Sequence, residues 1–306
     1  MQALPEGRGP LGRLTIRFGG LFLRNEQLRG FVLLSPTLAI MLLLLAVPLG
    51  IVIAYSFWTK TSDGYEALLT TANYENFVVH PAYPLLLGKS LLISLCVAAA
   101  AVGLAYPMAY FVAFRVKQAK ILWLILITVP FWTSYLLRVF AWKIVLGYNG
   151  VINSGLTSIG VIDEPLGFLL YNPIAVVITL AHAWAAFAIL PIYVSLAKID
   201  RSLLEAATDL GDGPLARFLR VTLPLSMPGV IAASLLVFIP TVGDYVTPKL
   251  VGGTTGLMIG NIIQIMFGPA NNWPSGAAMA VSSMITIGLS VIVIVWFARK
   301  MTRHVA

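Results

Sequence analysis

Charged side chains are scarce in this chain. Asp, Glu, Lys and Arg make up 10% of its 306 residues, whereas hydrophobic residues make up 59% and the mean hydropathy is +0.90. A soluble globular domain carries about 25% charged residues, because its surface faces water. So low a charge content excludes a soluble globular protein of this length and predicts that most of the surface faces lipid.

Cysteine and histidine are also rare. The single cysteine, Cys96, lies in an apolar run, which excludes a disulfide framework and a cysteine-based metal site. The three histidines, His80, His182 and His304, are too scattered in the sequence to indicate a metal cluster. No paired carboxylates or Ser/Lys dyad stand at positions suited to catalysis, and the chain has no G-x-x-x-x-G-K-[ST] phosphate loop. We expect no metal, no cofactor and no catalytic site in this chain.

Six apolar stretches approach the length of about 20 residues that a helix needs to cross a bilayer. They are residues 31–58, 90–114, 121–137, 173–197, 226–246 and 276–298. The third is short and ends at Arg138. Two semi-apolar stretches, 65–79 and 257–267, are predicted to be interfacial or docking helices. The sequence thus predicts an all-α membrane protein with six transmembrane helices and both termini on one side.

The basic residues indicate which side that is. Fifteen of the 20 Lys and Arg residues lie in the two tails, the second-to-third connection and the fourth-to-fifth connection, and five lie on the opposite side. Because cytoplasmic connections are enriched in Lys and Arg, both termini are predicted to be cytoplasmic. This distribution explains the net charge of +8 without nucleic acid. The N-terminal tail is too basic and its apolar run too long for a cleavable signal peptide; it is either an amphipathic segment on the inner leaflet or a disordered tail.

The fourth-to-fifth connection, residues 198–224, reads as a soluble helical element with the sequence KIDRSLLEAATDLGDGPLARFLRVTLP. Helix formers fill 202–210, and Gly211 is placed to end that helix. Pro214 suits the first turn of a second helix capped by Asp212 or Gly213, which is predicted to run over 215–223 and to end before Pro224. An ordinary solvated loop is the alternative.

The same connection carries a spaced motif. It consists of Glu205-Ala206-Ala207, Leu210-Gly211, Val221 and Leu223-Pro224. It resembles the EAA loop of type I ABC importer permeases, in which EAA is followed by three residues, Gly, nine residues, Ile, one residue and Leu-Pro. The spacing agrees throughout, and the departure is Val221 in place of Ile.

The resemblance implies a MetI-like permease fold in which this connection is a coupling helix that enters a groove of a separate ATPase. ATP and Mg²⁺ would be bound by that partner. The residue types suit this role: Ala206 and Ala207 are small enough for close approach, Gly211 permits a sharp bend, and Glu205 supplies an orienting charge.

A wider resemblance, over about residues 86–298, points to the polyamine branch of this family. It rests on four stretches, 130–153, 162–169, 189–200 and 223–253, which are similar to the first permease of spermidine/putrescine uptake systems. It implies a bacterial inner-membrane complex with an ATPase dimer, a second related permease and a periplasmic binding protein. The chain would comprise a tail (1–30), a first span with a periplasmic segment (31–85), the transmembrane domain (86–298) and a second tail (299–306).

These resemblances do not determine the cargo. A polyamine is expected, and another amine, an amino-acid derivative or an opine-like solute is the alternative within the family. An ion-coupled secondary transporter is the alternative of another class, although such a carrier would usually contain several intramembrane ionisable groups.

Asp244, at the end of the fifth span, is the candidate for contact with a cationic cargo. Pro240, Gly243 and Pro248 around it predict a broken helix that lines a cavity. A carboxylate with the neighbouring Tyr245 would attract an ammonium group by charge and by cation–π contact. The alternative is an interfacial Asp244 paired with Lys249 or Arg138.

Three other groups of residues could have either a functional or a purely structural role. The aromatic residues near the end of the third span, Trp132, Tyr135, Phe140 and Trp142, form either an interfacial belt or a cage for cargo. His182 and Trp184 are both expected to be packed, and His182 is expected to form a hydrogen bond to a neighbouring helix. The acidic pair Asp163 and Glu164 either docks a binding protein or forms a solvated turn.

Overall fold

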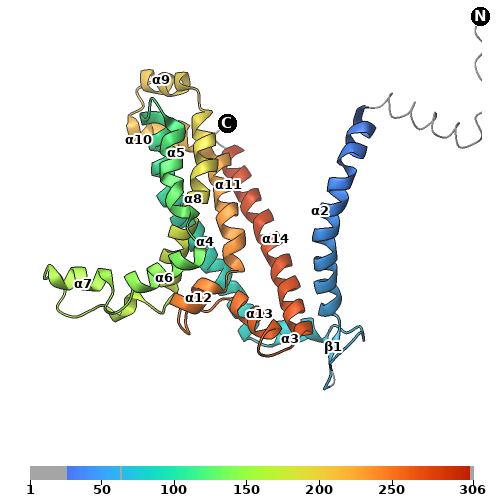
Figure 1. Ribbon diagram of the computed structural model, residues 1–306. Coiled ribbons are helices and arrows are strands. Elements are labelled where there is room, and N and C mark those ends of the chain that lie inside the picture. The colour runs from blue at the N-terminus through green and yellow to red at the C-terminus, as the bar shows by residue number, and fades with distance from the viewer. Residues whose placement is uncertain (1–25, 63, 304–306) are drawn as a thin grey trace, which may run out of the picture. The chain divides into compact units, whose positions relative to one another are not determined.

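The computed structural model describes residues 26–62 and 64–303, and these are mostly helical (Figure 1). The chain divides into two compact units, residues 1–55 and 56–306. The first unit contains all but the last residue of α2 (Glu26–Ser56), whose apolar part, Gly30–Ser56, is long enough to cross a membrane. Residues 31–48 of this helix are exposed. The predicted amphipathic or disordered segment falls almost entirely outside the described residues.

The second unit begins with a small β-hairpin and continues as helices. Its elements are β1 (Thr59–Lys60), β2 (Tyr65–Glu66), α3 (Ala72–Val79), α4 (Ala82–Tyr110), the π-helix η1 (Phe111–Arg115), α5 (Lys120–Thr128), the 3₁₀ helix η2 (Val129–Trp132), α6 (Tyr135–Val145), α7 (Val151–Ser158), the 3₁₀ helix η3 (Gly167–Leu169), α8 (Pro173–Ala197), α9 (Arg201–Asp209), α10 (Pro214–Arg217), the π-helix η4 (Phe218–Thr222), α11 (Leu223–Val242), α12 (Val246–Val251), α13 (Ile259–Phe267) and α14 (Trp273–Arg303). The two antiparallel strands pair Thr59 with Glu66.

Five helices among the described residues are long and apolar enough to cross a membrane, and a bent pair makes a sixth. The fourth predicted span matches α8 at both ends. Its start is fixed by Asn172, whose side chain accepts hydrogen bonds from the backbone N–H groups of Ile174 and Ala175, while Pro173 occupies the first helical position. The predicted helix 257–267 corresponds to α13, whereas only 72–79 of the stretch 65–79 is helical and its start belongs to the hairpin.

The third predicted span, 121–137, is wrong as a single helix. It ends at Trp132, and α6 then leaves at an angle of 79°. Pro130 cannot donate a backbone hydrogen bond, the last turn narrows to a 3₁₀ helix, and Thr133 and Ser134 are extended. The continuous segment, Lys120–Trp132, is therefore about 21 Å long. Beyond the bend, α6 exposes apolar side chains, including Leu137 (66%) and Ile144 (67%).

A second correction concerns Pro224. The helix predicted to end before this residue continues, because α10, η4 and α11 form one helical segment over Pro214–Val242. The π-turn explains the continuity: the backbone N–H of Leu223 bonds to the carbonyl of Phe218, five residues back. We attribute the tolerance of Pro224 to this wider turn, which relaxes the helix next to a residue that lacks its own donor.

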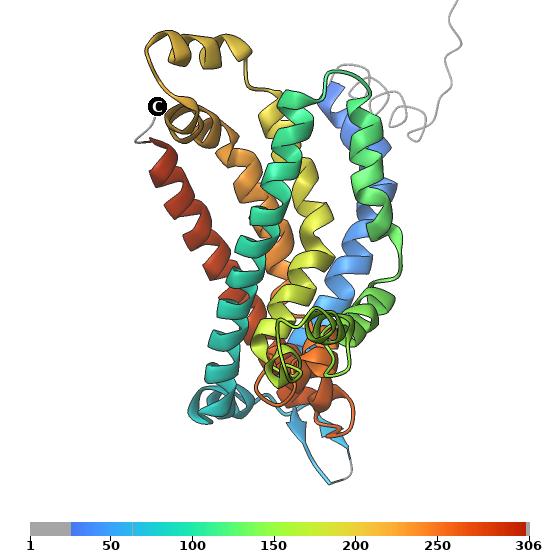
Figure 2. The same cartoon turned by 90° about the vertical axis from the view of Figure 1, so that its left-hand side faces the viewer.

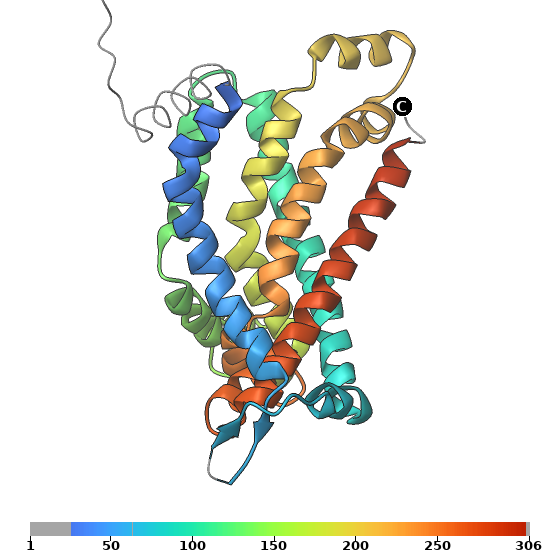
Figure 3. The same cartoon turned by 90° about the vertical axis from the view of Figure 1, so that its right-hand side faces the viewer.

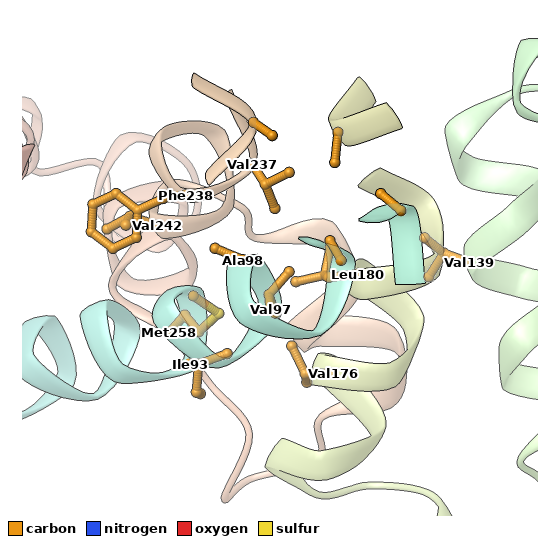
Figure 4. Packing of buried hydrophobic residues seen from close by; sticks show 14 of the residues in the cluster. Ile93, Val97, Ala98, Val139, Val176, Leu180, Val237, Phe238, Val242 and Met258 are labelled. Atoms are coloured by element: carbon orange, nitrogen blue, oxygen red, sulfur yellow. The ribbon is translucent and has the colours of Figure 1, made fainter. Parts of the chain in front are cut away.

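The core of the second unit lies between α4, α8 and α11 (Figure 4). Val97 of α4, Leu180 of α8 and Val237 of α11 are fully buried. Alanines line α4 at positions 98, 101, 105 and 109, and small residues of this kind let membrane helices pack closely.

The two regions predicted to carry function, the connection 198–224 and the segment around Asp244, lie at opposite ends of this unit. Figures 1, 2 and 3 show α9 and α10 at the same end as the C-terminal part of α14, and α12 and α13 at the other end. Because α11 begins beside α10 and ends before Asp244, it connects the two regions directly.

Candidate functional site

The predicted coupling helix is α9. Asp200 caps it by accepting a hydrogen bond of 3.0 Å from the backbone N–H of Ser202. This backbone hydrogen bond, with a contribution from the Ser202 side chain, lowers the pKa of the Asp200 carboxyl below its ordinary value. The cap is therefore ionised at neutral pH and stabilises the start of α9.

The end of α9 forms a Schellman turn. The backbone N–H of Asp212 bonds to the carbonyl of Ala207 (3.0 Å), and that of Gly211 bonds to the carbonyl of Thr208 (2.9 Å). Gly211 has φ +90°, a region that disfavours other residues, and no atom lies within 4 Å of the position a Cβ would take. Gly213, with an extended backbone, is the N-cap of α10, so it and not Asp212 takes that role before Pro214.

The exposed side of α9 is mostly polar, with an apolar stripe along it. Leu203 is 48% exposed and Leu210 is 88% exposed, and Glu205 and Ala206 are exposed beside them. Ala207 is buried, at 7% exposure, and its place in the coupling contact stays a prediction. The remaining motif residues, Val221, Leu223 and Pro224, are half-buried in η4 and at the start of α11.

Two side-chain contacts that the sequence did not predict hold α9 against the following helix. Arg217 Nη1 donates to Thr208 Oγ1 at 2.7 Å, and Arg220 Nη1 forms an ion pair with Asp212 Oδ1 at 2.8 Å. We call these two contacts the clasp. Asp212 and Arg220 lie eight positions apart across a glycine turn, and this pattern is too common in sequences to predict an ion pair.

At the other end of α11, Asp244 belongs to a polar cluster with α6 and α12. The hydroxyl of Tyr135 donates to Asp244 Oδ2 at 2.6 Å and lies 2.5 Å from the hydroxyl of Thr247. Asp244 Oδ1 accepts from the backbone N–H of Val246 at 3.0 Å. Across residues 26–62 and 64–303 the one side-chain ion pair is that of the clasp. The alternative pairing of Asp244 with Lys249 or Arg138 is therefore absent there, and Tyr135 is its side-chain partner.

The predicted aromatic group does not form one cage. Trp132 is 79% exposed at the end of η2, whereas Tyr135 lies beyond the bend, with its ring 6.3 Å from that of Trp184. His182 is exposed, whereas packing was expected, and its ring lies 5.3 Å from the rings of Phe131 and Trp142. Its side chain thus has aromatic contacts in place of the expected hydrogen bond. Tyr245 is 45% exposed, and its carbonyl accepts from Asn261 Nδ2 at 2.8 Å.

Arg138 lies one helical turn after Tyr135. Its guanidinium is 5.7 Å from the centre of the Phe131 ring. Its Nε and Nη1 are buried without an acceptor among the described residues, and the same holds for Trp184 Nε1. Arg138 and Trp184 therefore carry hydrogen-bond donors that have no acceptor in the described part of the chain.

A largely apolar groove of about 650 Å³ lies between η2, α8 and α11 and includes none of the residues of the polar cluster. Its lining includes Trp132, Phe187, Leu190 and Gly229. No group of three or more His, Cys, Asp or Glu side chains in the described part of the chain is placed to hold a metal ion.

The chain matches a protein family over residues 20–303, namely "Binding-protein-dependent transport system inner membrane component". It is 36% identical to the "Spermidine/putrescine transport system permease protein PotB" of Escherichia coli (strain K12), over 85% of this chain and 94% of that protein. The protein of the same name from Haemophilus influenzae is also 36% identical, over 81% and 86%. The "Inner membrane ABC transporter permease protein YdcU" of Escherichia coli (strain K12) is 32% identical, over 86% and 91%.

Solved structures share the fold. A chain of a bacterial ABC transporter involved in the import of the polysaccharide alginate aligns with a TM-score of 0.63 at 17% identity, over 94% of this chain and 99% of that chain. A chain of the alginate transporter in complex with an alginate-bound periplasmic protein aligns with a TM-score of 0.68 at 16% identity, over 94% and 98%.

Proposed function

The chain belongs to the family of binding-protein-dependent transport system inner membrane components, and on this basis we propose that it forms half of the translocation pathway for spermidine or putrescine in an ATP-driven importer. It is a multi-pass membrane permease subunit of an ABC importer. The observation that carries the proposed cargo is the 36% identity to spermidine/putrescine permeases, which extends over 94% of the Escherichia coli relative.

The coupling region supports a separate ATPase as the source of energy. Leu203, Ala206 and Leu210 present an exposed apolar surface on a helix that is already capped at both ends. Such a surface suits insertion into a groove, because little conformational freedom is lost on binding. ATP and Mg²⁺ are then bound by the ATPase dimer, and closure of that dimer drives alternating access.

The remaining partners follow from the arrangement of the two ends. With both termini cytoplasmic, α9 faces the ATPase, and α12 and α13 face the periplasm, where a substrate-binding protein delivers the cargo. A second related permease completes the pathway. The predominance of basic residues on the α9 side supports this orientation.

Asp244 is the proposed contact for an ammonium group of the cargo. Each carboxylate oxygen of Asp244 accepts one hydrogen bond, Oδ2 from Tyr135 and Oδ1 from Val246. A carboxylate can accept about four hydrogen bonds in total, so further donors can bind. An ammonium group carries three donors and can therefore bind beside Tyr135, with the Tyr245 ring available for a cation–π contact. Trp132 is exposed enough to line the same route.

A second cargo class is favoured by Arg138. A fully cationic polyamine is repelled by its guanidinium, whereas an amine that also carries a carboxylate would supply the acceptor that Arg138 Nε and Nη1 lack. An amino-acid derivative would then bind with its ammonium at Asp244 and its carboxylate at Arg138.

The experiment begins with purification of the complex from native membranes and mass spectrometry of the retained proteins and small molecules. The complex is then reconstituted in vesicles, and ATP-dependent uptake of labelled putrescine, spermidine and an ω-amino acid of equal chain length is compared. Uptake of the polyamines alone supports the proposal, and preferential uptake of the ω-amino acid selects the second class. Uptake driven by an ion gradient without ATP contradicts both and supports a secondary transporter.

A further inference from the structure

The segment that carries Asp244 is a break between two helices. α11 ends at Val242 and α12 begins at Val246, so Gly243, Asp244 and Tyr245 lie between them. Gly243 and Tyr245 are exposed and Asp244 is half-buried, so this segment is accessible to a cargo. Backbone between helices lacks the regular hydrogen bonds of a helix, and the position of the Asp244 carboxylate therefore depends on what packs against the segment.

The first turn of α13 packs directly against this break. An added Cβ on Gly260 would lie 2.6 Å from the carbonyl oxygen of Gly243 and 2.9 Å from that of Asp244. Real Cβ atoms essentially never come so close to another atom, so a side chain at this position would displace one of the two backbones. Glycine thus allows the backbone of α13 to contact the segment that carries Asp244.

Asn261, the next residue, bonds to the break through its side chain. This side chain is buried (3% exposed), and its Nδ2 donates to the carbonyl oxygen of Tyr245 at 2.8 Å. Its Oδ1 accepts from the backbone N–H of Met258 at 3.0 Å, which is one hydrogen bond of a capping box. A carboxylate in the same place could form this cap, but it would have no donor for Tyr245. The amide is therefore the group that forms both hydrogen bonds.

The start of α13 is itself fixed to the core. Met258 is fully buried in the core cluster (Figure 4). The backbone N–H of Ile259 donates to Ser90 Oγ of α4 at 2.8 Å, and Ser90 is also fully buried. The segment that carries Asp244 is thus attached to α4 through α13, in addition to its hydrogen bond with Tyr135 of α6.

From these contacts we propose that Asn261 is a positioning residue for cargo: by holding the Tyr245 carbonyl, it fixes the Asp244 carboxylate and the Tyr245 ring relative to each other. Asn261 itself does not touch the cargo. The two groups proposed to bind an ammonium are already in place before the cargo arrives, so binding does not have to order them. This inference rests on the proposed function, since it requires that Asp244 bind the cargo.

The test measures ATP-dependent uptake of labelled putrescine by the reconstituted complex over a range of concentrations. Asn261→Ala removes the donor to Tyr245. We expect it to raise the concentration for half-maximal uptake about 2- to 10-fold, the effect of one hydrogen bond, while the maximal rate and the retention of the ATPase stay unchanged.

Asn153→Ala is the matched control. Asn153 is an equally buried amide (1% exposed), and its Nδ2 and Oδ1 also bond to backbone, at the carbonyl and the N–H of Leu166. It contacts no residue of the Asp244 segment by these bonds, and its replacement should keep the wild-type half-maximal concentration. An equal rise in both variants means a general loosening of the outer end and overturns the proposal.

A double-mutant cycle separates positioning from a purely structural role. If Asn261 acts through Asp244, Asn261→Ala should add little to the effect of Asp244→Asn, whereas the effects of independent sites multiply. Gly260→Ala displaces the same segment while Asn261 stays in place, and it should also raise the half-maximal concentration. Multiplying effects in the cycle, a wild-type value in Asn261→Ala, or failure of both α13 variants to assemble overturns the proposal.

Hydrogen exchange in the cargo-free complex distinguishes this inference from the proposed function. The backbone N–H of Val246 is bonded to Asp244 Oδ1, so Asn261→Ala should speed its exchange whichever cargo is transported. If that exchange is unchanged, the positioning role is refuted even though putrescine is taken up. If exchange speeds up but Asp244→Asn leaves uptake unchanged at every concentration, the cargo contact at Asp244 is wrong and the inference fails with it.

Discussion

Replacement of Gly211 isolates the backbone contribution to coupling. This residue has φ +90°, and the space around its missing Cβ is empty to 4 Å, so a larger residue meets no steric obstacle and its cost is conformational alone. For a side-chain-bearing residue that cost is roughly 1–2 kcal/mol. At RT of about 0.6 kcal/mol this lowers the fraction of molecules with a correctly formed turn about 5- to 30-fold, unless binding of the ATPase compensates.

The order of a substitution series follows from the same reasoning. Gly211→Asn should be mildest, because Asn tolerates the left-handed region; Gly211→Ala should be worse; and Gly211→Val worst, because of its β-branch. Gly213→Ser is the matched control, since Gly213 is an extended N-cap, a position that favours Ser, and also has no atom within 4 Å of an added Cβ.

The assay separates coupling from folding. Each variant is quantified in the membrane, then tested for retention of the ATPase, cargo-stimulated ATP hydrolysis and uptake in vesicles. We expect Gly211→Val to insert normally, because the turn lies on an exposed connection outside the core, yet to lose stimulated hydrolysis and uptake. Wild-type transport by Gly211→Val, or equal losses in Gly213→Ser, would refute the reasoning.

The other predictions concern orientation, cargo and the ends of α9. Reporter fusions at the C-terminus and within 211–214 should read cytoplasmic and one after Asp163 periplasmic, and a periplasmic reading at the C-terminus would contradict the topology. Asp244→Asn should raise the cargo concentration needed for half-maximal uptake while the complex still assembles, because the change removes charge and keeps shape; unchanged uptake at every concentration argues against the contact. Glu205→Lys should weaken ATPase retention through charge reversal, and a pull-down against Glu205→Gln measures this. Because folding lowers the pKa of Asp200, its cap should persist from neutral pH and be lost only as the pH falls below the ordinary 3.8, which amide exchange at Ser202 would detect; loss of protection already at pH 5–6 would contradict it.

Local signals in the sequence were sufficient for much of the fold. The bounds of α8 were predicted from its apolar run, and the structure places the Asn172 cap and Pro173 at its start. The Gly211 turn was predicted from the position of the glycine after a run of helix formers, and the Schellman hydrogen bonds are present. In both cases the determining interactions lie within a few residues of each other along the chain.

The errors arose where several local effects compete or where contacts are distant. Pro224 usually marks a helix end, but the π-turn before it allows continuation, and nothing in the residue types specified that turn. The bend after Trp132 required an extended Thr133 and Ser134 inside an otherwise apolar run. The Tyr135–Asp244 bond joins residues 109 positions apart, so its partner could not be chosen over Lys249 or Arg138 without the packing of α6.

The shortness of the third span has a consequence for the surrounding lipid. A helical segment of about 21 Å is shorter than a hydrocarbon layer of about 30 Å, a mismatch of the kind that local thinning of the bilayer relieves. Because α6 leaves this segment at an angle of 79°, its exposed apolar side chains would face the acyl chains when the segment stands upright in the bilayer. The bend that brings Tyr135 to Asp244 thereby makes the polar cluster sensitive to membrane thickness: longer acyl chains should strain the α5–α6 junction and slow transport, and vesicles of graded lipid chain length offer a direct comparison.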